Sequence, residues 1–499
     1  MVSRISLFIC LCLLLSAEAI ADRLVILHTN DTHSQIEPAA NGLGGIARRK
    51  VLIDSVRNVN RNVLLVDAGD MVQGTLYFTL FGGEVESKLM NSLGYDIQIL
   101  GNHEFDNGLD ELLKLFGSLN AKKISTNYDF TDTQLSGIFD PFVIKEFDGK
   151  KIGFLAINLD PKGMISETNS KGIVYLDGIK AANATAWYLK HIAKTDMVIA
   201  VTHIGYNADK LISDLSIARK SEDIDIIIGG HTHTLIDPAD SSTPAFLVEN
   251  AVGRPVLIAQ AGGRGYNVGE IDIDLDSLTA KSSILPVDGR YDRLQPNVMD
   301  SIISPYRDEV EKFRNFRIGK TKGLKKSDWS LVNWMADFVL DEGATLVPEK
   351  IDMAIVNKGG VRADLASGNV TKGDIMQIFP FDNRVEVIRI SGKDLREALD
   401  VMASRGGDGV SREVDAAFDP ESGKCISINI GGVPLDENRE YIVATIDYLA
   451  RGGDYMESLM NGEVIGSSEN ILYKDIIDAL QHNKVSLKAD RTLRMHPEK

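Results

Sequence analysis

The chain has 499 residues, of which 44% are hydrophobic and 25% are charged. This composition is that of a globular protein, and the length allows for two or three domains. The sequence has no internal repeat and average glycine and proline contents, which excludes solenoid, collagen-like and low-complexity classes. Its 54 lysines and arginines are outnumbered by 71 aspartates and glutamates, which gives a net charge of −17. Because a nucleic-acid polymer is bound through a basic surface, we expect no such partner.

The first 21 residues have the pattern of a secretory signal peptide. Arg4 precedes an apolar run, residues 5–15, that is too short to span a bilayer, and small residues then allow cleavage before Asp22. The C-terminus is polar and carries no lipid-anchor signal. We therefore expect an exported protein, periplasmic or extracellular, with no membrane anchor. The mature chain would keep one cysteine, Cys425, in a segment typical of a buried strand, so no intrachain disulfide can form.

The first half of the mature chain predicts an α/β domain, which we assign to residues 22–298. Short runs rich in valine and isoleucine alternate with segments of helical spacing, as in sheets that are covered on both faces. These runs are Leu24–Leu27, Val63–Val66, Ile97–Leu100, Ile152–Ile157, Met197–Val201 and Ile224–Ile228. Functional sites of open α/β sheets gather at the carboxyl ends of the strands, so the loops that follow these runs are expected to converge.

A second, smaller α/β domain is predicted for residues 315–499. Between the two domains, apolar residues recur at helical spacing from Met299 to Phe313, which predicts a linker helix over residues 299–314. Within the second domain, one apolar stripe with the spacing of a helix begins near Ser330. The stripe consists of Leu331, Trp334, Met335, Phe338 and Val339.

Polar loops with metal-ligating side chains follow five of the six apolar runs. Five of the nine histidines of the sequence lie in these loops, together with carboxylates and an asparagine. The candidate ligands are Asp31, His33, Asp70, Asn102, His203, His231 and His233. Neutral imidazoles, carboxylates and an amide oxygen are ligands of divalent first-row metals such as Mn, Zn, Co or Fe. Five such loops favour a shared metal site over unrelated surface histidines.

The number of candidate ligands predicts two metal ions. Seven ligands are too many for one ion of coordination number four or five, whereas two ions share them evenly if one carboxylate bridges. Two ions about 3.5–4 Å apart suit hydrolysis at phosphorus, because they clamp the phosphoryl group and acidify a water. They would also supply the positive charge that the acidic surface lacks.

His103 and Asp106 are the candidate catalytic pair. His103 follows the candidate ligand Asn102 and would point into the site while remaining free. Asp106, three residues on, can fix the tautomer of His103 and favour its charged form. A cationic His103 would stabilise the pentavalent transition state or protonate the leaving oxygen.

Together these loops resemble the signature of calcineurin-like metallophosphoesterases. The segments that carry the resemblance are Thr29–His33, Asp67–Asp70, Gly101–Asp106, Thr202–His203 and Gly230–His233. With the export signal and the second domain, the chain is similar to the secreted 5′-nucleotidase family, which includes periplasmic UDP-sugar hydrolases. The resemblance implies that the first domain is a layered α-β-β-α fold and the second a nucleotide-binding domain.

The resemblance also implies a division of the ligands between the two metals. One metal would be held by Asp31, His33, Asp70 and His233. The other would be held by Asp70, Asn102, His203 and His231, with Asp70 bridging. His103 would be the catalytic histidine with Asp106 behind it, whereas no family role carries over to Glu104, which we expect at the surface or behind the ligands.

Three segments of the second domain resemble the nucleotide-binding domain of the same family. They are Asn357–Arg362, Phe379–Asn383 and Asp447–Asp454. By this resemblance, Phe381 and Tyr448 would sandwich a nucleobase, which aromatic faces suit. Arg362 would reach the phosphate, Asn357 the base and Asp454 the ribose hydroxyls.

The sequence departs from the family pattern in two places. Lys358 stands where the Asn-Gly-Gly-Gly loop of the family has its first glycine. Lys325 and Lys326 stand where the family has one or two phosphate-facing arginines. Because lysine lacks the bidentate fork of arginine, phosphate binding would be weaker or shifted toward other leaving groups.

The resulting hypothesis is an exported two-metal phosphohydrolase, monomeric or dimeric, that converts nucleoside 5′-monophosphates to nucleoside and phosphate. On the same fold, hydrolysis of nucleotide sugars such as UDP-sugars and a 2′,3′-cyclic nucleotide phosphodiesterase activity are alternatives. The base-stacking aromatics argue against a thiosulfohydrolase of the sulfur-oxidation type. A non-catalytic exported nucleotide-binding or adhesion protein would be expected to have lost metal ligands, yet all seven candidates are present.

Overall fold

The computed structural model describes residues 23–162, 164–165, 168–207, 212–292, 297–381 and 383–498. The predicted signal peptide lies outside these ranges. Within them, no helix combines the length and the apolar character that a membrane span requires. The chain divides into two compact units between Asp308 and Glu309. This boundary lies inside helix α8 (Val298–Arg314), where the sequence predicts the linker helix.

In its described part, the first unit contains two six-stranded sheets. The order of the first is β14 (Thr279–Pro286), β13 (Asn267–Asp274), β1 (Arg23–Thr29), β2 (Asn62–Asp67), β3 (Ile97–Gln98) and β4 (Lys122–Lys123). The order of the second is β11 (Leu247–Glu249), β12 (Pro255–Ala259), β10 (Ile226–Ile228), β9 (Met197–His203), β7 (Lys150–Asn158) and β6 (Phe142–Phe147). A separate two-stranded ribbon pairs β5 (Tyr128–Asp129) with β8 (Val174–Tyr175).

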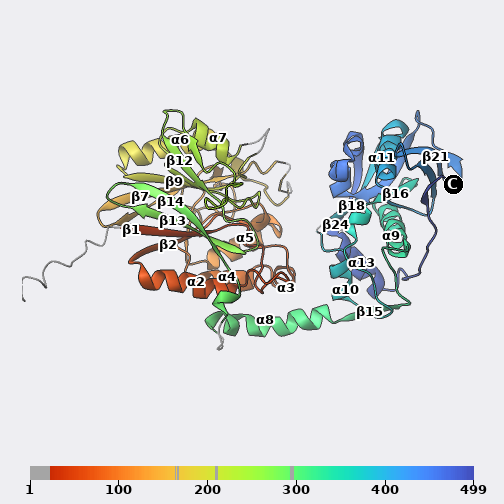
Figure 1. The fold of residues 1–499 in the computed structure, drawn as a ribbon, viewed down its shortest axis with the longest axis horizontal. Coiled ribbons are helices and arrows are strands. Elements are labelled where there is room, and N and C mark those ends of the chain that lie inside the picture. Colours follow the sequence, from red (N-terminus) through yellow and green to blue (C-terminus); the bar gives the residue numbers. More distant parts are fainter. Residues whose placement is uncertain are drawn as a thin grey trace, which may run out of the picture. The chain divides into compact units, whose positions relative to one another are not determined.

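Helices cover the outer faces of both sheets, which confirms the predicted layered α/β fold. The helices beside the first sheet are α2 (Ile46–Val59), α3 (Leu76–Phe81), α4 (Glu84–Leu93) and α5 (Gly108–Ser118). Those beside the second sheet are α6 (Gly178–Trp187) and α7 (Asp214–Lys220). Figure 1 shows α2 on one side of the paired sheets and α6 and α7 on the other.

The apolar run of β1 explains why the sheets pair. Successive side chains of a strand point to opposite faces, so a run that is apolar throughout can be buried on both. Leu24 and Ile26 pack with Phe154 and Val201 of the second sheet in the core between the sheets. Val25 and Leu27, on the other face of β1, are equally buried. The Val- and Ile-rich pattern thus specifies a strand between two apolar layers.

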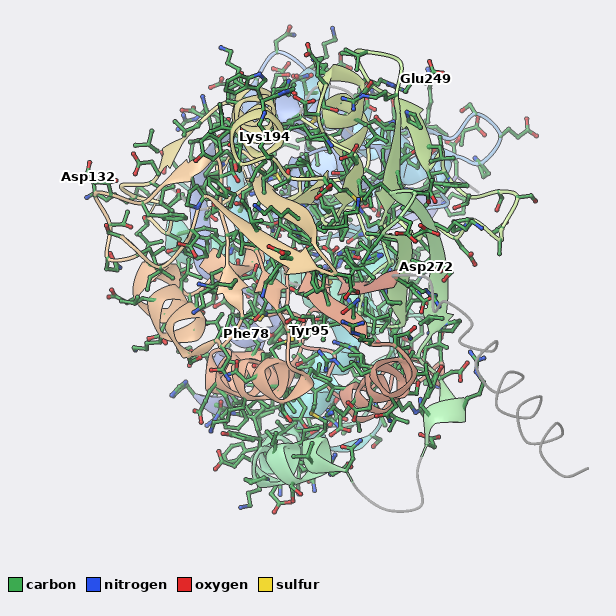
Figure 2. The ribbon with its side chains drawn as sticks, turned by 90° about the vertical axis from the view of Figure 1, so that its left-hand side faces the viewer. Phe78, Tyr95, Asp132, Lys194, Glu249 and Asp272 are labelled. Carbon is green, nitrogen blue, oxygen red and sulfur yellow. The ribbon has the colours of Figure 1, made fainter. Side chains whose placement is uncertain are left out.

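The parallel registers bring the strand ends to one edge. Thr29 of β1 lies opposite Asp67 of β2, and Asn158 of β7 lies opposite His203 of β9. Thr29 donates a hydrogen bond of 2.6 Å from its hydroxyl to Asp67, and the same hydroxyl lies 2.7 Å from the phenol oxygen of Tyr95. Tyr95 is labelled in Figure 2 near the helices that cover the first sheet. The carboxyl ends of β1 and β2 are therefore tied to this helical layer.

The second unit is also α/β. Its five-stranded sheet has the order β19 (Gly409–Val410), β16 (Met353–Val356), β23 (Glu440–Ile446), β18 (Arg384–Ser391) and β24 (Glu463–Ile471). A four-stranded sheet has the order β22 (Val433–Pro434), β21 (Lys424–Ile430), β20 (Val414–Asp419) and β25 (Met495–Pro497), and a ribbon pairs β15 (Arg317–Thr321) with β17 (Gly368–Thr371). The helices are α9 (Ser330–Leu346), α10 (Lys372–Ile378), α11 (Gly392–Ser404), α12 (Asp447–Ala450) and α13 (Leu472–Gln481).

Two local predictions in this unit are confirmed. All five residues of the apolar stripe lie on α9 and are buried in the core of the unit. Cys425 lies on β21 and is 4% exposed. Two strands of the first unit are shorter than predicted. β10 begins at Ile226, and the pairing of β3 ends at Gln98, because the next residues leave the sheet to form the loop with Asn102.

Candidate active site

The seven candidate metal ligands lie together at the carboxyl edge of the two sheets of the first unit. They follow or end the strands β1, β2, β3, β9 and β10, whose sequence separations are large but whose ends are neighbours. His203 is the last residue of β9 and is completely buried. His233, the most accessible of the seven, has a side chain that is 43% exposed. The site is therefore a buried cluster that opens to solvent on one side.

Three of these residues form a first group, Asp31, His33 and His233. The Nε2 atoms of His33 and His233 lie 2.9 Å apart. Oδ1 of Asp31 lies 3.4 Å from Nε2 of His233 and 4.0 Å from Nε2 of His33. Ligands at about 2.0–2.2 Å from one tetrahedral cation are separated by distances of this size. The three atoms can therefore share one divalent ion.

A second group contains Asp70, Asn102, His203 and His231. Nε2 of His203 lies 3.1 Å from Oδ2 of Asp70, and Nδ1 of His231 lies 3.0 Å from Oδ1 of Asn102. The same Oδ2 of Asp70 is 3.9 Å from Nε2 of His33 in the first group. Asp70 thus stands between the two groups, in the position that a bridging carboxylate takes.

The hydrogen bonds of two histidines orient their rings as metal ligands. Nδ1 of His203 lies 2.7 Å from the carbonyl oxygen of Ala68, and Nδ1 of His33 lies 3.3 Å from that of Val72. A carbonyl only accepts, so Nδ1 carries the proton and Nε2 of a neutral ring presents a lone pair. Among the described residues, the buried Nε2 of His203 makes no hydrogen bond of good geometry, and the polar atom that faces it is Oδ2 of Asp70 at 3.1 Å, an arrangement that suits two ligands of one cation.

The charges of the cluster favour the binding of a cation. Burial opposes a positive charge on His203, but Asp70 and Asp31 outweigh it and raise the pKa of His203 to about 10. Burial lowers the pKa of His33 and of His231 to about 4. The two carboxylates therefore attract positive charge, while two of the imidazoles stay neutral. A divalent ion satisfies both tendencies.

The backbone around these ligands is strained. Positive φ angles are uncommon for residues other than glycine and cluster at functional sites. Five of the seven candidate ligands have them, at 49° for Asp31, 47° for His33, 55° for Asp70, 81° for His231 and 52° for His233. Gly101 is required beside them, since a Cβ at this position would collide with Oδ1 of Asp70. The fold thus holds the ligand side chains in place through the main chain.

Glu104 is the residue of this site that sequence reasoning undervalued. It is 3% exposed, so of the two positions that the sequence left open, the surface and the place behind the ligands, the second is correct. Its Oε2 accepts hydrogen bonds from the amides of Gly101 at 2.5 Å and Asp70 at 3.0 Å, and its Oε1 accepts from Met71 at 2.8 Å. One carboxylate thereby joins the two loops with Asp70 and Asn102. The only feature of the sequence that could have indicated this role is the position of Glu104 inside the Asn-His-Glu-Phe run.

His103 lies at the accessible side of the cluster. Its side chain is 32% exposed, and its ring centroid is 5.3 Å from that of His33. Nδ1 lies 2.9 Å from Oδ2 of Asp106, as the sequence predicts. Burial opposes a charge on His103, but the hydrogen bond to Asp106 and the charge of Asp70 raise its pKa to about 9. His103 is therefore placed and charged to act on an anionic group at the cluster.

In the second unit, all five predicted substrate-binding residues line one cavity of about 220 Å³. Its lining consists of Asn357, Gly359, Gly360, Arg362, Phe381, Asn383, Tyr448 and Asp454. Phe381 is 38% exposed and Tyr448 is 45% exposed, so both rings are accessible to a molecule bound in the cavity. The guanidinium of Arg362 lies 4.9 Å from the ring centre of Phe381. The sequence assigned no role to Asn383.

Side-chain hydrogen bonds connect the polar wall of this cavity. Oδ2 of Asp454 accepts from Nδ2 of Asn357 at 2.7 Å, and Oδ1 accepts from the hydroxyl of Tyr448 at 3.0 Å. Of the three lysines at which the sequence departs from the family, Lys358 and Lys326 make contacts outside this lining. The ammonium of Lys358 lies 4.1 Å from the ring centre of Trp329, and that of Lys326 donates to the carbonyl of Val361 at 3.0 Å. Neither ammonium belongs to the described lining of the cavity.

Comparisons with known proteins relate each of the two units to a known family. Residues 24–235 match the family described as calcineurin-like phosphoesterase, and residues 312–460 match the 5′-nucleotidase C-terminal domain. The chain is 28% identical to a snake venom 5′-nucleotidase of Crotalus adamanteus, over 92% of this chain and 86% of the relative. It is 29% identical to the trifunctional nucleotide phosphoesterase protein YfkN of Bacillus subtilis over 94% of this chain, which spans about a third (34%) of YfkN.

A solved structure supports the same assignment. The crystal structure of a 5′-nucleotidase precursor from Thermus thermophilus is 28% identical, with a TM-score of 0.67. The match covers 95% of this chain and 99% of that chain. The similarity therefore includes both units and the helix between them.

Proposed function

This chain belongs to the family of metal-dependent phosphoesterases that combine a calcineurin-like phosphoesterase domain with a 5′-nucleotidase C-terminal domain, and we propose that it hydrolyses nucleoside 5′-monophosphates to nucleoside and phosphate. The observation that carries this proposal is one chain with both a seven-ligand cluster and a cavity flanked by two exposed aromatic rings. The first feature suits reaction at phosphorus, and the second suits recognition of a nucleoside.

The ligand distances support two metal sites in the first unit. Asp31, His33, Asp70 and His233 would hold one divalent ion. Asp70, Asn102, His203 and His231 would hold the other. Two such ions polarise the phosphoryl oxygens and make a water acidic at neutral pH. The set of imidazole, carboxylate and amide ligands is compatible with Mn, Zn, Co or Fe.

His103 and Asp106 would act as the catalytic pair. Asp106 holds the proton on Nδ1 of His103, which leaves Nε2 free for the substrate. In its cationic form, His103 would stabilise the negative charge that develops on the phosphoryl oxygens. It could also give its Nε2 proton to the departing 5′ oxygen of the nucleoside.

The cavity of the second unit would bind the nucleoside part of the substrate. Phe381 and Tyr448 would stack on the two faces of the base, since every base offers a π surface. Asn357 would contact the base edge, Asp454 the ribose hydroxyls and Arg362 the phosphate. The first unit, residues 22–298, would thus supply the catalytic groups. The second unit, residues 315–499, follows the linker helix and would determine which substrate is bound.

A phosphate-release assay tests this function. The protein should release phosphate from AMP in the presence of Mn²⁺, and a chelator should abolish this release. Release that is insensitive to the chelator, or absent for every nucleotide tried, would reject the proposal. A panel of nucleotide sugars and 2′,3′-cyclic nucleotides separates the alternatives on the same fold, and the relative YfkN is described as a trifunctional nucleotide phosphoesterase protein.

Export is a separate part of the proposal. The first 21 residues would direct the chain out of the cytoplasm and be removed before Asp22. N-terminal sequencing of protein recovered from the periplasm or the culture medium of an expression host tests this. A mature protein that still begins at Met1 would contradict it.

A further inference from the structure

The loop that carries Asp454 is held in an unfavourable backbone conformation. Asp454 has φ 54° and ψ 37°, and the next residue, Tyr455, has φ 61°. Such angles are uncommon for residues other than glycine and persist where the surroundings enforce them. Tyr455 is 83% exposed, so packing of its own side chain does not stabilise the loop. Hydrogen bonds from other residues hold the segment in place, and one of them joins the amide of Asp454 to the hydroxyl of Tyr448 at 3.2 Å.

Arg405, which follows helix α11 as its C-cap, is a further group that holds this segment. Its Nη1 donates to the carbonyl oxygen of Asp454 at 3.1 Å and lies 3.7 Å from Oδ2 of the same residue. Its Nη2 lies 3.0 Å from Oδ2 of Asp408. The two arms of one planar guanidinium therefore bind two different segments, a geometry that lysine cannot reproduce.

Asp408 extends this connection to the other wall of the cavity. Its side chain is 7% exposed, and its Oδ1 accepts hydrogen bonds from the amides of Lys358 and Gly409. The amide of Lys358 directly follows Asn357, which donates to Asp454 from inside the cavity. Arg405 and Asp408 thus connect the loop of Asn357 to the loop of Asp454 outside the cavity lining. The hydrogen bond between Asn357 and Asp454 connects the same two loops within the lining.

The guanidinium of Arg405 also offsets the negative charges of Asp408 and Asp454. Asp408 and Asp454 are both acidic, and without Arg405 the two carboxylates would repel each other across the gap between their loops. Arg405 is not part of the described lining of the cavity, whereas Asp454 and Asn357 are. We therefore expect the effect of Arg405 on a ligand to act through Asp454 and Asn357.

We propose that Arg405 is a positioning residue for nucleotide binding, which sets Asp454 and Asn357 at the spacing that a ribose and its base require. This inference rests on the proposed function of the cavity. It predicts that Arg405 governs the KM for nucleotides and leaves the chemistry at the metal cluster unchanged.

The test compares Arg405→Gln with a matched control, Arg412→Gln, in the full-length protein. Arg412 is another arginine of the second unit and pairs with Asp341 outside the cavity. Arg405→Gln should raise the KM for AMP about tenfold, the loss expected for a charge-assisted hydrogen bond, with kcat within about twofold. For a small aryl phosphate, kcat/KM should stay within about twofold. Arg412→Gln should change neither, and Arg405→Lys should recover only part of the loss.

The other outcomes overturn the inference in distinguishable ways. An unchanged KM for AMP, or an equal loss on both substrates, would show that Arg405 does not position the nucleotide site or is merely structural. Full recovery by Arg405→Lys would show that charge alone matters and that the two-armed contact does not. Tyr448→Ala separates this result from a failure of the proposed function. If Tyr448→Ala also leaves the KM for AMP unchanged, the cavity itself is not the nucleotide site.

Discussion

The two sites of this protein are built in different ways. In the first unit, the candidate ligands sit on a strained main chain, and five of the seven have positive φ angles. In the second unit, two half-exposed aromatic rings and a few side-chain hydrogen bonds form the cavity. The candidate ligands thus depend on the conformation of the main chain, whereas the proposed substrate cavity is lined chiefly by side chains, with Asp454 at φ 54° as its strained residue. Substitutions in the cluster should affect every phosphate ester, and those in the cavity only nucleotides.

Asp70→Asn should have the largest effect. Asp70 stands between both groups of ligands, so the loss of its charge weakens both metal sites at once. We expect kcat/KM to fall about 1000-fold or more for AMP and for an aryl phosphate alike. Elemental analysis should find less bound metal. Wild-type turnover with both metals retained would show that Asp70 does not bridge.

His103→Ala should lower turnover about 100- to 10,000-fold, the range typical of a general acid or base. The fall should again be the same for both substrates, because His103 lies at the metal cluster and not in the cavity. Metal content should stay intact, as measured in the same preparation. Loss of both metals on this substitution would instead identify His103 as a ligand.

Glu104→Gln tests whether the hydrogen bonds that Glu104 accepts from the main chain are needed for metal binding. A glutamine must turn its NH₂ group toward the amide of Met71 or toward those of Asp70 and Gly101, which leaves a buried donor unpaired. We expect metal affinity to fall about 10- to 100-fold, as for other groups behind metal ligands. Glu111→Gln, on the surface of α5, is the control. Equal metal titrations of the two variants would contradict the role of Glu104.

Tyr448→Ala should raise the KM for AMP about tenfold, because stacking of one base on one aromatic ring contributes about 1–3 kcal/mol. The KM for a small aryl phosphate should change much less. Tyr448→Phe keeps the ring but loses the hydrogen bond to Asp454, so it should show a smaller rise. Steady-state kinetics on both substrates measure this. Equal effects of Tyr448→Ala on the two substrates would remove Tyr448 from the binding site.

The smallest predicted effect concerns stability. Glu86, on α4, is 4% exposed, and burial raises its pKa to about 7 from an ordinary value of 4.5. The folded state therefore binds this proton more tightly than the unfolded state. The stability that Glu86 contributes is complete below about pH 4.5 and is lost as the pH rises to about 7. Glu86→Gln should reduce the drop in Tm between pH 5 and pH 8 by a few degrees, and an unchanged drop would show that other groups cause it.

The predictions that succeeded rest on patterns within a few neighbouring residues. An apolar run followed by Asp, Asn or His marks the end of a buried strand and a polar loop, and parallel pairing then brings these loops to one edge. The apolar stripe of α9 is equally local. The residues that were missed act through partners distant in sequence. Glu104 binds the amide of Asp70, 34 residues before it, and Arg405 binds the carbonyl of Asp454, 49 residues after it.

The amino-acid sequence by itself determined the two α/β units, the helix between them and the set of chemical groups at the strand ends. These features follow from hydrophobic periodicity and from residue types that lie side by side in the chain. Only the tertiary structure decided that Asp70 lies within 4 Å of both histidine groups, that Glu104 is buried beneath them, and that Lys358 contacts Trp329. The physical reason is that a hydrogen bond or a charge contact depends on which loops the sheet registers bring together, and this information is distributed over the whole chain.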